Sequence, residues 1–166
     1  MGVPLSAIMS SVSAESVIRL LIGRVAQASA QELLLECRAV GMMEQPYSES
    51  PLAELLPPFD KGYHLTFELD GKNKAIFEIL ETQGRVLQAG FSVLFPRLPF
   101  FSGARAAYNH ARRLIEGHYG LGVPAKFAGA STLNYGDEKT LSYLSIRRIM
   151  GRRMITFRTG NKDFWP

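Results

Sequence analysis

The sequence contains one cysteine, Cys37, and three histidines, His64, His110 and His118. A single cysteine cannot form a disulfide within the chain, which favours a reducing compartment. None of these residues has the HxxxH, HExxH or CxxC spacing that holds zinc, so we expect no dedicated metal site. We expect Cys37, which lies in an apolar stretch, to be a buried structural thiol, and His64 to be a surface or hydrogen-bonded side chain.

Long apolar runs are also missing. No run approaches the roughly 18 residues that would span a bilayer, so we expect no membrane span. Residues 1–12 have no positively charged region and too short an apolar stretch for a secretory signal. We interpret them as an N-terminal tail and expect a cytoplasmic protein.

Signatures of catalysis are sparse. There is no GxSxG sequence for a nucleophile, and the adjacent carboxylates Asp137 and Glu138 lie in a predicted turn, where solvation explains them. Gly117, Gly120 and Gly122 follow a predicted helix rather than preceding one, and they lack the Lys-Ser/Thr of a phosphate loop. A non-catalytic protein without a cofactor is therefore favoured, although dispersed catalytic residues would leave no pattern and enzymatic activity stays open.

The composition is that of a globular chain. The 166 residues are 46% hydrophobic and 20% charged, so we expect one domain, residues 1–166. Residues 42–60 hold four prolines and are predicted to form a connection, with one helical turn at residues 52–56.

Two stretches have helical periodicity. In residues 13–40, Ser13 is a predicted N-cap and Gly41 a predicted C-terminal residue, while the capping-box spacing of Ser29 and Glu32 allows two helices with a bend between them. The second helix is predicted over residues 103–116, with Ser102 as its N-cap and the glycines from Gly117 onward as its end. Its predicted buried stripe is Ala104, Ala107, Tyr108, Ala111, Leu114 and Ile115.

The remaining stretches have the period of two that strands show, as in Tyr63, Leu65, Phe67 and Leu69, which should share one face. The predicted strands are residues 63–69, 75–81, 85–95 (with a bulge at Gly90), 125–135, 139–148 and 152–158. We therefore predict an α+β fold in the order α-βββ-α-βββ, with an antiparallel sheet of about six strands and two main helices packed on one face.

Positive charge is concentrated in the second half. Residues 1–96 have 7 Lys+Arg and 11 Asp+Glu, a net of −4, whereas residues 97–166 have 12 and 4, a net of +8. The predicted basic site contains six cations within a stretch that has no carboxylate: Arg147, Arg148, Arg152, Arg153, Arg158 and Lys162. If the two Arg pairs flank a tight turn, alternation sends one Arg of each pair to each face of the sheet. Such a surface attracts an anionic partner, although cations on an edge strand can also serve only to prevent edge-to-edge pairing.

A second candidate for an anion site lies where a loop enters the second predicted helix. Arg97, Ser102, Gly103 and Arg105 surround its N-terminus, whose free N–H groups favour negative charge.

Three functions follow from these features. The first is a binding protein, such as an immunity, adaptor or chaperone protein, that uses the basic C-terminal region against an acidic protein surface. The second is nucleic-acid binding by the same arginines, with Tyr135, Tyr143 or Phe164 for stacking. The third is a small-molecule pocket or an enzyme site between sheet and helices. Its lining would be Phe67, Phe77, Phe91, Phe95 and Tyr108, although core packing is the favoured explanation for these aromatic residues.

Overall fold

The computed structural model describes residues 11–50, 59–96, 103–127 and 130–164. The elements in chain order are β1 (Ser11–Val12), α1 (Ala14–Leu21), α2 (Ala30–Ala39), β2 (Met43–Gln45), the 3-10 turn η2 (Tyr47–Glu49), β3 (Lys61–Leu69), β4 (Asn73–Thr82), β5 (Arg85–Leu94), α3 (Ala104–Tyr119), β6 (Val123–Phe127), β7 (Ala130–Gly136), β8 (Thr140–Ile149), β9 (Arg152–Asn161) and the 3-10 turn η3 (Lys162–Phe164).

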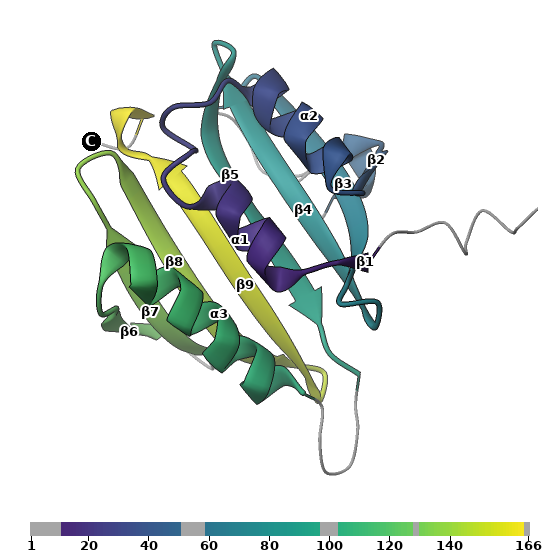
Figure 1. The fold of residues 1–166 in the computed structure, drawn as a ribbon, viewed down its shortest axis with the longest axis vertical. Coiled ribbons are helices and arrows are strands. Elements are labelled where there is room, and N and C mark those ends of the chain that lie inside the picture. The colour runs from purple at the N-terminus through teal and green to yellow at the C-terminus, as the bar shows by residue number, and fades with distance from the viewer. Residues whose placement is uncertain (1–10, 51–58, 97–102, 128–129, 165–166) are drawn as a thin grey trace, which may run out of the picture.

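All the described strands belong to one nine-stranded sheet in the order β1-β3-β4-β5-β9-β8-β7-β6, with β2 also paired to β3. Every pairing is antiparallel except that of β1 with β3. Strands β5 and β9 join the two halves of the chain at the centre of the sheet (Figure 1). The predicted α+β class with a mostly antiparallel sheet is confirmed.

The predicted count of six strands and two helices is wrong, because the described part of the chain holds nine strands and three α-helices. Residues 13–40 form two helices, since Gly23 has a φ of 69° and Ser29 begins a new helix with a complete capping box. The stretch predicted as one strand at residues 125–135 is the hairpin of β6 and β7. The predicted tail and connection also contribute short strands, β1 and β2, while the helical turn expected at residues 52–56 lies outside the described residues.

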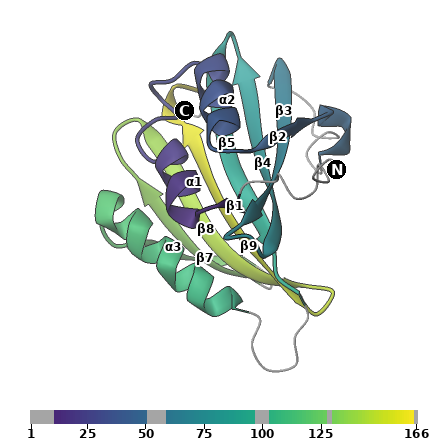
Figure 2. The same ribbon diagram turned by 45° about the vertical axis from the view of Figure 1, so that its right-hand side comes forward.

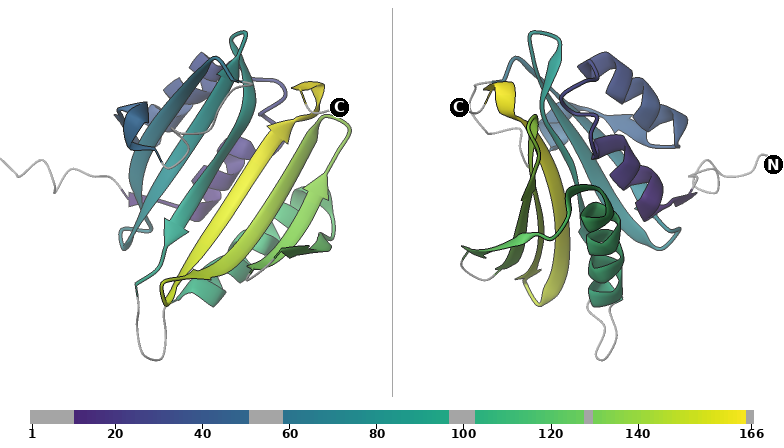
Figure 3. Two further views of the ribbon diagram at one scale, coloured as in Figure 1. Left: turned by 180° about the vertical axis from the view of Figure 1, so that it is seen from behind. Right: turned by 60° about the vertical axis from the view of Figure 1, so that its left-hand side comes forward.

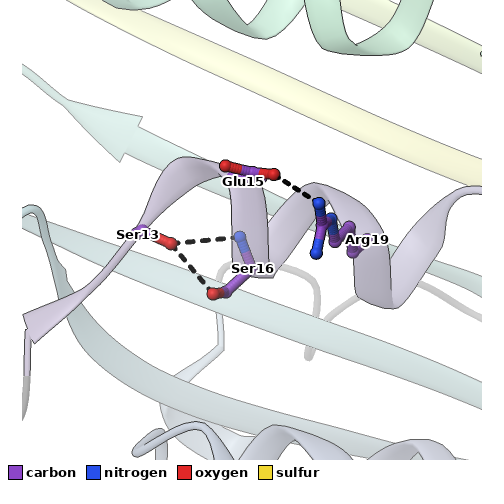
Figure 4. Close-up of polar contacts among 4 residues, drawn as sticks. All are labelled: Ser13, Glu15, Ser16 and Arg19. Carbon is purple, nitrogen blue, oxygen red and sulfur yellow. Dashed lines mark hydrogen bonds and ion pairs between the residues drawn. The ribbon is translucent and has the colours of Figure 1, made fainter. Parts of the chain in front are cut away.

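The start of α1 shows how local chemistry sets an element boundary (Figure 4). The Ser13 hydroxyl accepts a hydrogen bond from the backbone N–H of Ser16 at 3.1 Å, as predicted for an N-cap. Glu15 and Arg19, one turn apart, form an exposed ion pair of 2.5 Å between Oε1 and Nη2.

Helix α3 runs further than its sequence predicts. It continues through Gly117 and ends at Gly120, which has a φ of 81°. His110 and His118 therefore lie on the same helix, whereas the predicted end at residue 116 would have separated them. Gly117 is tolerated because it is exposed and keeps a helical conformation, at a cost of about 1 kcal/mol relative to alanine.

The helices lie on one face of the sheet, where α2 contacts β4, α1 contacts β5 and α3 contacts β9 (Figures 1 and 2). The core lies between these layers. The predicted shared face of Tyr63, Leu65, Phe67 and Leu69 is confirmed, since all four are buried. The aromatic residues considered as a pocket lining are likewise buried in this core: Phe67, Phe77, Phe91, Phe95 and Tyr108.

Two further core predictions have different outcomes. Cys37 is fully buried in α2, as predicted. Leu114, predicted to be a core residue of α3, is only partly buried and packs at the margin of the core.

The opposite face of the sheet, which we call the open face, carries no α-helix in the described part of the chain (Figure 3). The sheet is visibly twisted and curved when seen from its edge (Figure 3). None of the described helices is long and apolar enough to cross a membrane.

Candidate anion-binding groove

The arginines at the end of the β8–β9 hairpin divide between the two faces of the sheet. Arg148 faces Arg153 across the hairpin, and Arg147 faces Met154. Because side chains alternate along a strand, Arg148 and Arg153 lie on the helix-bearing face and Arg147 on the open face. This is the distribution that the sequence predicts for Arg pairs flanking a tight turn.

The structure brings one member of the second predicted anion site to these residues. Arg105, in the first turn of α3, lines a surface depression of about 360 Å³ together with Arg147, Arg148 and Arg153. Its remaining lining residues are Ala130, Ser131 and Ile146. Arg105 is distant in sequence from the three hairpin arginines, yet all four guanidinium groups border one depression, and no carboxylate is among the described residues that line it.

A second depression of about 660 Å³ continues from the first along α3, sharing Arg105, Ala130 and Ser131. Arg112 and Lys126 add two further cations there. We call the two depressions together the basic groove, and its cations are Arg105, Arg112, Lys126, Arg147, Arg148 and Arg153.

Five of these six cations form no ion pair with another described residue. Arg112 pairs with Glu116 at 2.8 Å, and this hydrogen bond is the main cause that lowers the pKa of the Glu116 carboxyl. The other five take part in none of the ion pairs between described residues. The guanidinium of Arg105 lies 5.8 Å from the ring centroid of Tyr108.

The other cations of the predicted basic site are held elsewhere. Arg158 pairs with Glu78, and Arg152 donates from Nε to the carbonyl of Phe95 at 3.2 Å. Lys162 donates to the carbonyl of Asp137 at the opposite end of β9. The structure therefore does not bring these three side chains into the groove, because backbone and carboxylate acceptors within the fold bind them.

The predicted anion site at the start of α3 is only partly described. Arg97 and Ser102 lie outside the described residues, and the prediction of Ser102 as the N-cap is wrong, because the N-cap falls one residue later in the chain. Gly103 occupies the N-cap position with a φ of 73° and without a side-chain hydrogen bond.

The sequence interpretation missed a buried polar cluster on the open face. Glu78 is 1% exposed, and its Oε1 atom accepts from Nη2 of Arg158 at 2.9 Å, while the Ser50 hydroxyl donates to its Oε2 atom. The sequence did contain a signal for this cluster, namely a glutamate inside the apolar strand that contains Phe77 and Ile79. A buried charge of this kind needs a partner of opposite charge.

The expected bulge at Gly90 is wrong, since the irregularity in β4–β5 pairing lies between Leu80 and Glu81.

His64 lies beside this cluster, directly across from Glu78 in the β3–β4 ladder. The expectation of a surface or hydrogen-bonded histidine is not met, because His64 is 4% exposed and its Nδ1 atom has no hydrogen-bond partner among the described residues. The ring of Tyr47 in η2 covers this end of the open face, where it occupies the space that a Cβ at Gly62 would need.

The chemical groups along the groove are those that bind anions. The residues described along it offer cations, hydroxyls and backbone groups. Within the described ranges, no group of three His, Cys, Asp or Glu side chains could hold a metal ion. In comparisons with protein-family models, with curated proteins and with solved structures, the chain matches none.

Proposed function

We propose that this chain is a non-catalytic binding protein that takes an acidic surface of another protein into the basic groove. The observation that carries the proposal is the convergence of Arg105, Arg147, Arg148 and Arg153 on one depression without a carboxylate among its described lining residues. Guanidinium groups so arranged repel one another, and an anionic partner removes that repulsion while accepting bidentate hydrogen bonds.

The distribution of aromatic residues supports a protein partner over a nucleic acid. Single-stranded nucleic acids use exposed aromatic rings as stacking platforms. Among the aromatics considered for stacking, Tyr135 is buried, Tyr143 faces the open face, and Phe164 lies 5.0 Å from the Arg85 guanidinium, outside the groove. Tyr108 does line the groove but is only 4% exposed.

The test compares two double variants with the same change in net charge. Arg148→Glu/Arg153→Glu reverses two groove cations, whereas Lys72→Glu/Lys139→Glu reverses two exposed lysines in turns away from the groove. Poly-glutamate and a duplex DNA oligonucleotide serve as probes, with binding measured by fluorescence anisotropy across about 50 to 500 mM salt and folding checked by circular dichroism.

We expect the arginine variant to bind poly-glutamate at least about tenfold more weakly at about 100 mM salt, and the lysine variant to stay within about threefold of the parent. Equal losses in both variants would mean that net charge alone governs binding, and the groove proposal would fail. Tighter binding of the duplex than of poly-glutamate at about 200 mM salt would replace the acidic protein partner with a nucleic acid.

A further inference from the structure

The open face contains a row of hydroxyl side chains that crosses four neighbouring strands. Ser92 of β5 faces Thr156 of β9, Thr156 faces Ser145 of β8, and Ser145 faces Thr132 of β7. All four are between 6% and 8% exposed, and the hydroxyls of Ser92 and Thr156 lie 3.0 Å apart. The centre of the open face is therefore lined by hydroxyl groups.

Two depressions lie along this face and join. One, of about 720 Å³, is lined from β4 to β7, and the other, of about 600 Å³, from β2 to β9. They share Ile76, Ser92 and Met154, so we treat them as one open-face groove. It crosses the six strands from β3 to β7, and the five spacings between them, at about 4.8 Å each, make it about 24 Å long.

Apolar side chains continue directly from a cation in this groove. Arg147 of β8 faces Met154 of β9, and Met154 faces Leu94 of β5, so the three side chains form a straight row across the sheet. Met154 and Leu94 are half-buried, as are Ile76 and Ile149, which also line the groove.

The charges of the groove cancel except for one. Glu78 and Arg158 form an ion pair, and Glu68 faces Lys74 across β3 and β4. Arg147 is exposed and has no ion-pair partner in the described part of the chain. The described lining residues thus carry one unbalanced positive charge, at one end of an apolar row.

We infer that the open-face groove binds a small organic monoanion with an apolar body. Its anionic group lies against Arg147, its body covers Met154, Leu94 and Ile76, and the hydroxyl row contacts its polar atoms. The volume of either depression falls within the roughly 300 to 1,000 Å³ of small-molecule sites. This site lies on the face of the sheet opposite to Arg148 and Arg153. Arg147, which also borders the basic groove, is the residue that the two proposals share.

The first arm of the test needs no variant. The fluorescent anion 1-anilinonaphthalene-8-sulfonate is bound to the full chain and displaced with decanoate, with decan-1-ol or with acetate. We expect decanoate to displace the dye at least about tenfold more effectively than either of the others, because it alone combines charge and apolar chain. Failure of decanoate at about 1 mM, or equal displacement by decan-1-ol, overturns the inference.

The second arm uses two adjacent arginines as a matched pair. Arg147→Ser should weaken decanoate binding about tenfold, whereas Arg148→Ser, one residue along the same strand but on the other face, should change it less than about twofold. Met154→Glu should abolish binding, since it places a carboxylate beside the anionic group. Equal losses in Arg147→Ser and Arg148→Ser contradict the site.

Although both proposals involve Arg147, the variants at Arg148 and Arg153 separate them. Arg148→Glu/Arg153→Glu should lose poly-glutamate and still bind decanoate. If decanoate binding is absent while the poly-glutamate result holds, only the open-face inference is overturned, and the reverse outcome overturns only the protein-binding function.

Discussion

Arg158 of β9 reaches across Gly90 of β5 to pair with Glu78 of β4, two strands away. The Nη2 and Oε1 atoms are 2.9 Å apart, and the side chains are only 11% and 1% exposed. Gly90 stands between the two residues in the ladder and contributes no side chain, so the stem of Arg158 lies over it. The pair thereby ties the N-terminal half of the sheet to the C-terminal half.

Replacing Gly90 with alanine should therefore destabilise the protein. A Cβ there would lie 2.4 Å from the carbonyl oxygen of Phe157 and 2.5 Å from Cγ of Arg158. We expect a loss of roughly 1 to 3 kcal/mol in the free energy of unfolding, measured by urea denaturation. Gly117→Ala is the control, because a Cβ there meets nothing within 4 Å and should stabilise α3 by about 0.5 to 1 kcal/mol. A stable Gly90→Ala variant would show that Arg158 does not cross at this point.

Removing one partner of the buried pair should cost much more than removing an exposed one. Glu78→Ala leaves the Arg158 guanidinium buried without its counter-charge, so we expect a loss of about 3 to 5 kcal/mol. Glu15→Ala breaks the exposed pair with Arg19, whose side chains are 49% and 76% exposed, and should change stability by no more than about 0.5 kcal/mol.

The double variant Glu78→Leu/Arg158→Met completes this test. It removes both charges and keeps similar volume, so it should recover most of the stability lost in Glu78→Ala. A double variant as unstable as the single one would mean that packing, and not the ion pair, accounts for the loss.

Local patterns predicted much of the fold. The alternation in β3 assigned Tyr63 and Phe67 to the core because one face of the strand is apolar throughout. The capping box at Ser29 and Glu32 marked the start of α2 because its hydrogen bonds are made within four residues. The pairing of β5 with β9 could not be predicted in this way, since it joins residues sixty or more apart in the sequence, and local periodicity does not indicate which strands pair.

Long-range packing also explains why the sequence predicted only part of the basic groove. The sequence identified Arg148 and Arg153 through their density of charge, and it identified Arg105 separately. Only the packing of α3 against β9 brings them to one depression. Arg158 looked equivalent to its neighbours in the sequence, yet its position opposite Gly90 gives it a structural partner.

Asp137 should stabilise the β7–β8 turn in a pH-dependent way. Its Oδ1 atom accepts hydrogen bonds from the backbone N–H groups of Lys139 at 2.8 Å and Thr140 at 2.7 Å, and from the Thr140 hydroxyl at 3.0 Å. Partial burial opposes ionisation, but these hydrogen bonds outweigh it, and the pKa of Asp137 lies below its ordinary value of 3.8.

Because the folded pKa is depressed, the stabilisation is fully present above about pH 4 and is lost as the pH falls through the folded pKa. Asp137→Ala should cost about 1 to 2 kcal/mol at pH 7, and the difference from the parent should shrink below pH 4. Thermal unfolding at pH 7 and pH 3 measures this, with the adjacent exposed Glu138→Ala as control. A pH-independent difference would indicate that the charge of Asp137 has no part in the turn.

The thiol of Cys37 should make the protein less stable in alkali. Burial raises the pKa of Cys37 from 9.0 to about 12, and the neighbouring Glu36 carboxylate adds to the rise. Above pH 9 the unfolded chain releases the thiol proton while the folded protein retains it, so the free energy of unfolding falls as the pH rises from about 9 towards 12. Between pH 8 and pH 10.5 this one group should lower the free energy of unfolding by about 2 kcal/mol.

Cys37→Ala lacks the thiol and isolates its effect from that of the buried tyrosines, whose pKa values are also raised. Urea denaturation of parent and variant at the two pH values gives the difference directly. If both lose the same stability, the thiol ionises as readily in the folded protein as in the unfolded chain, and its burial has no electrostatic consequence.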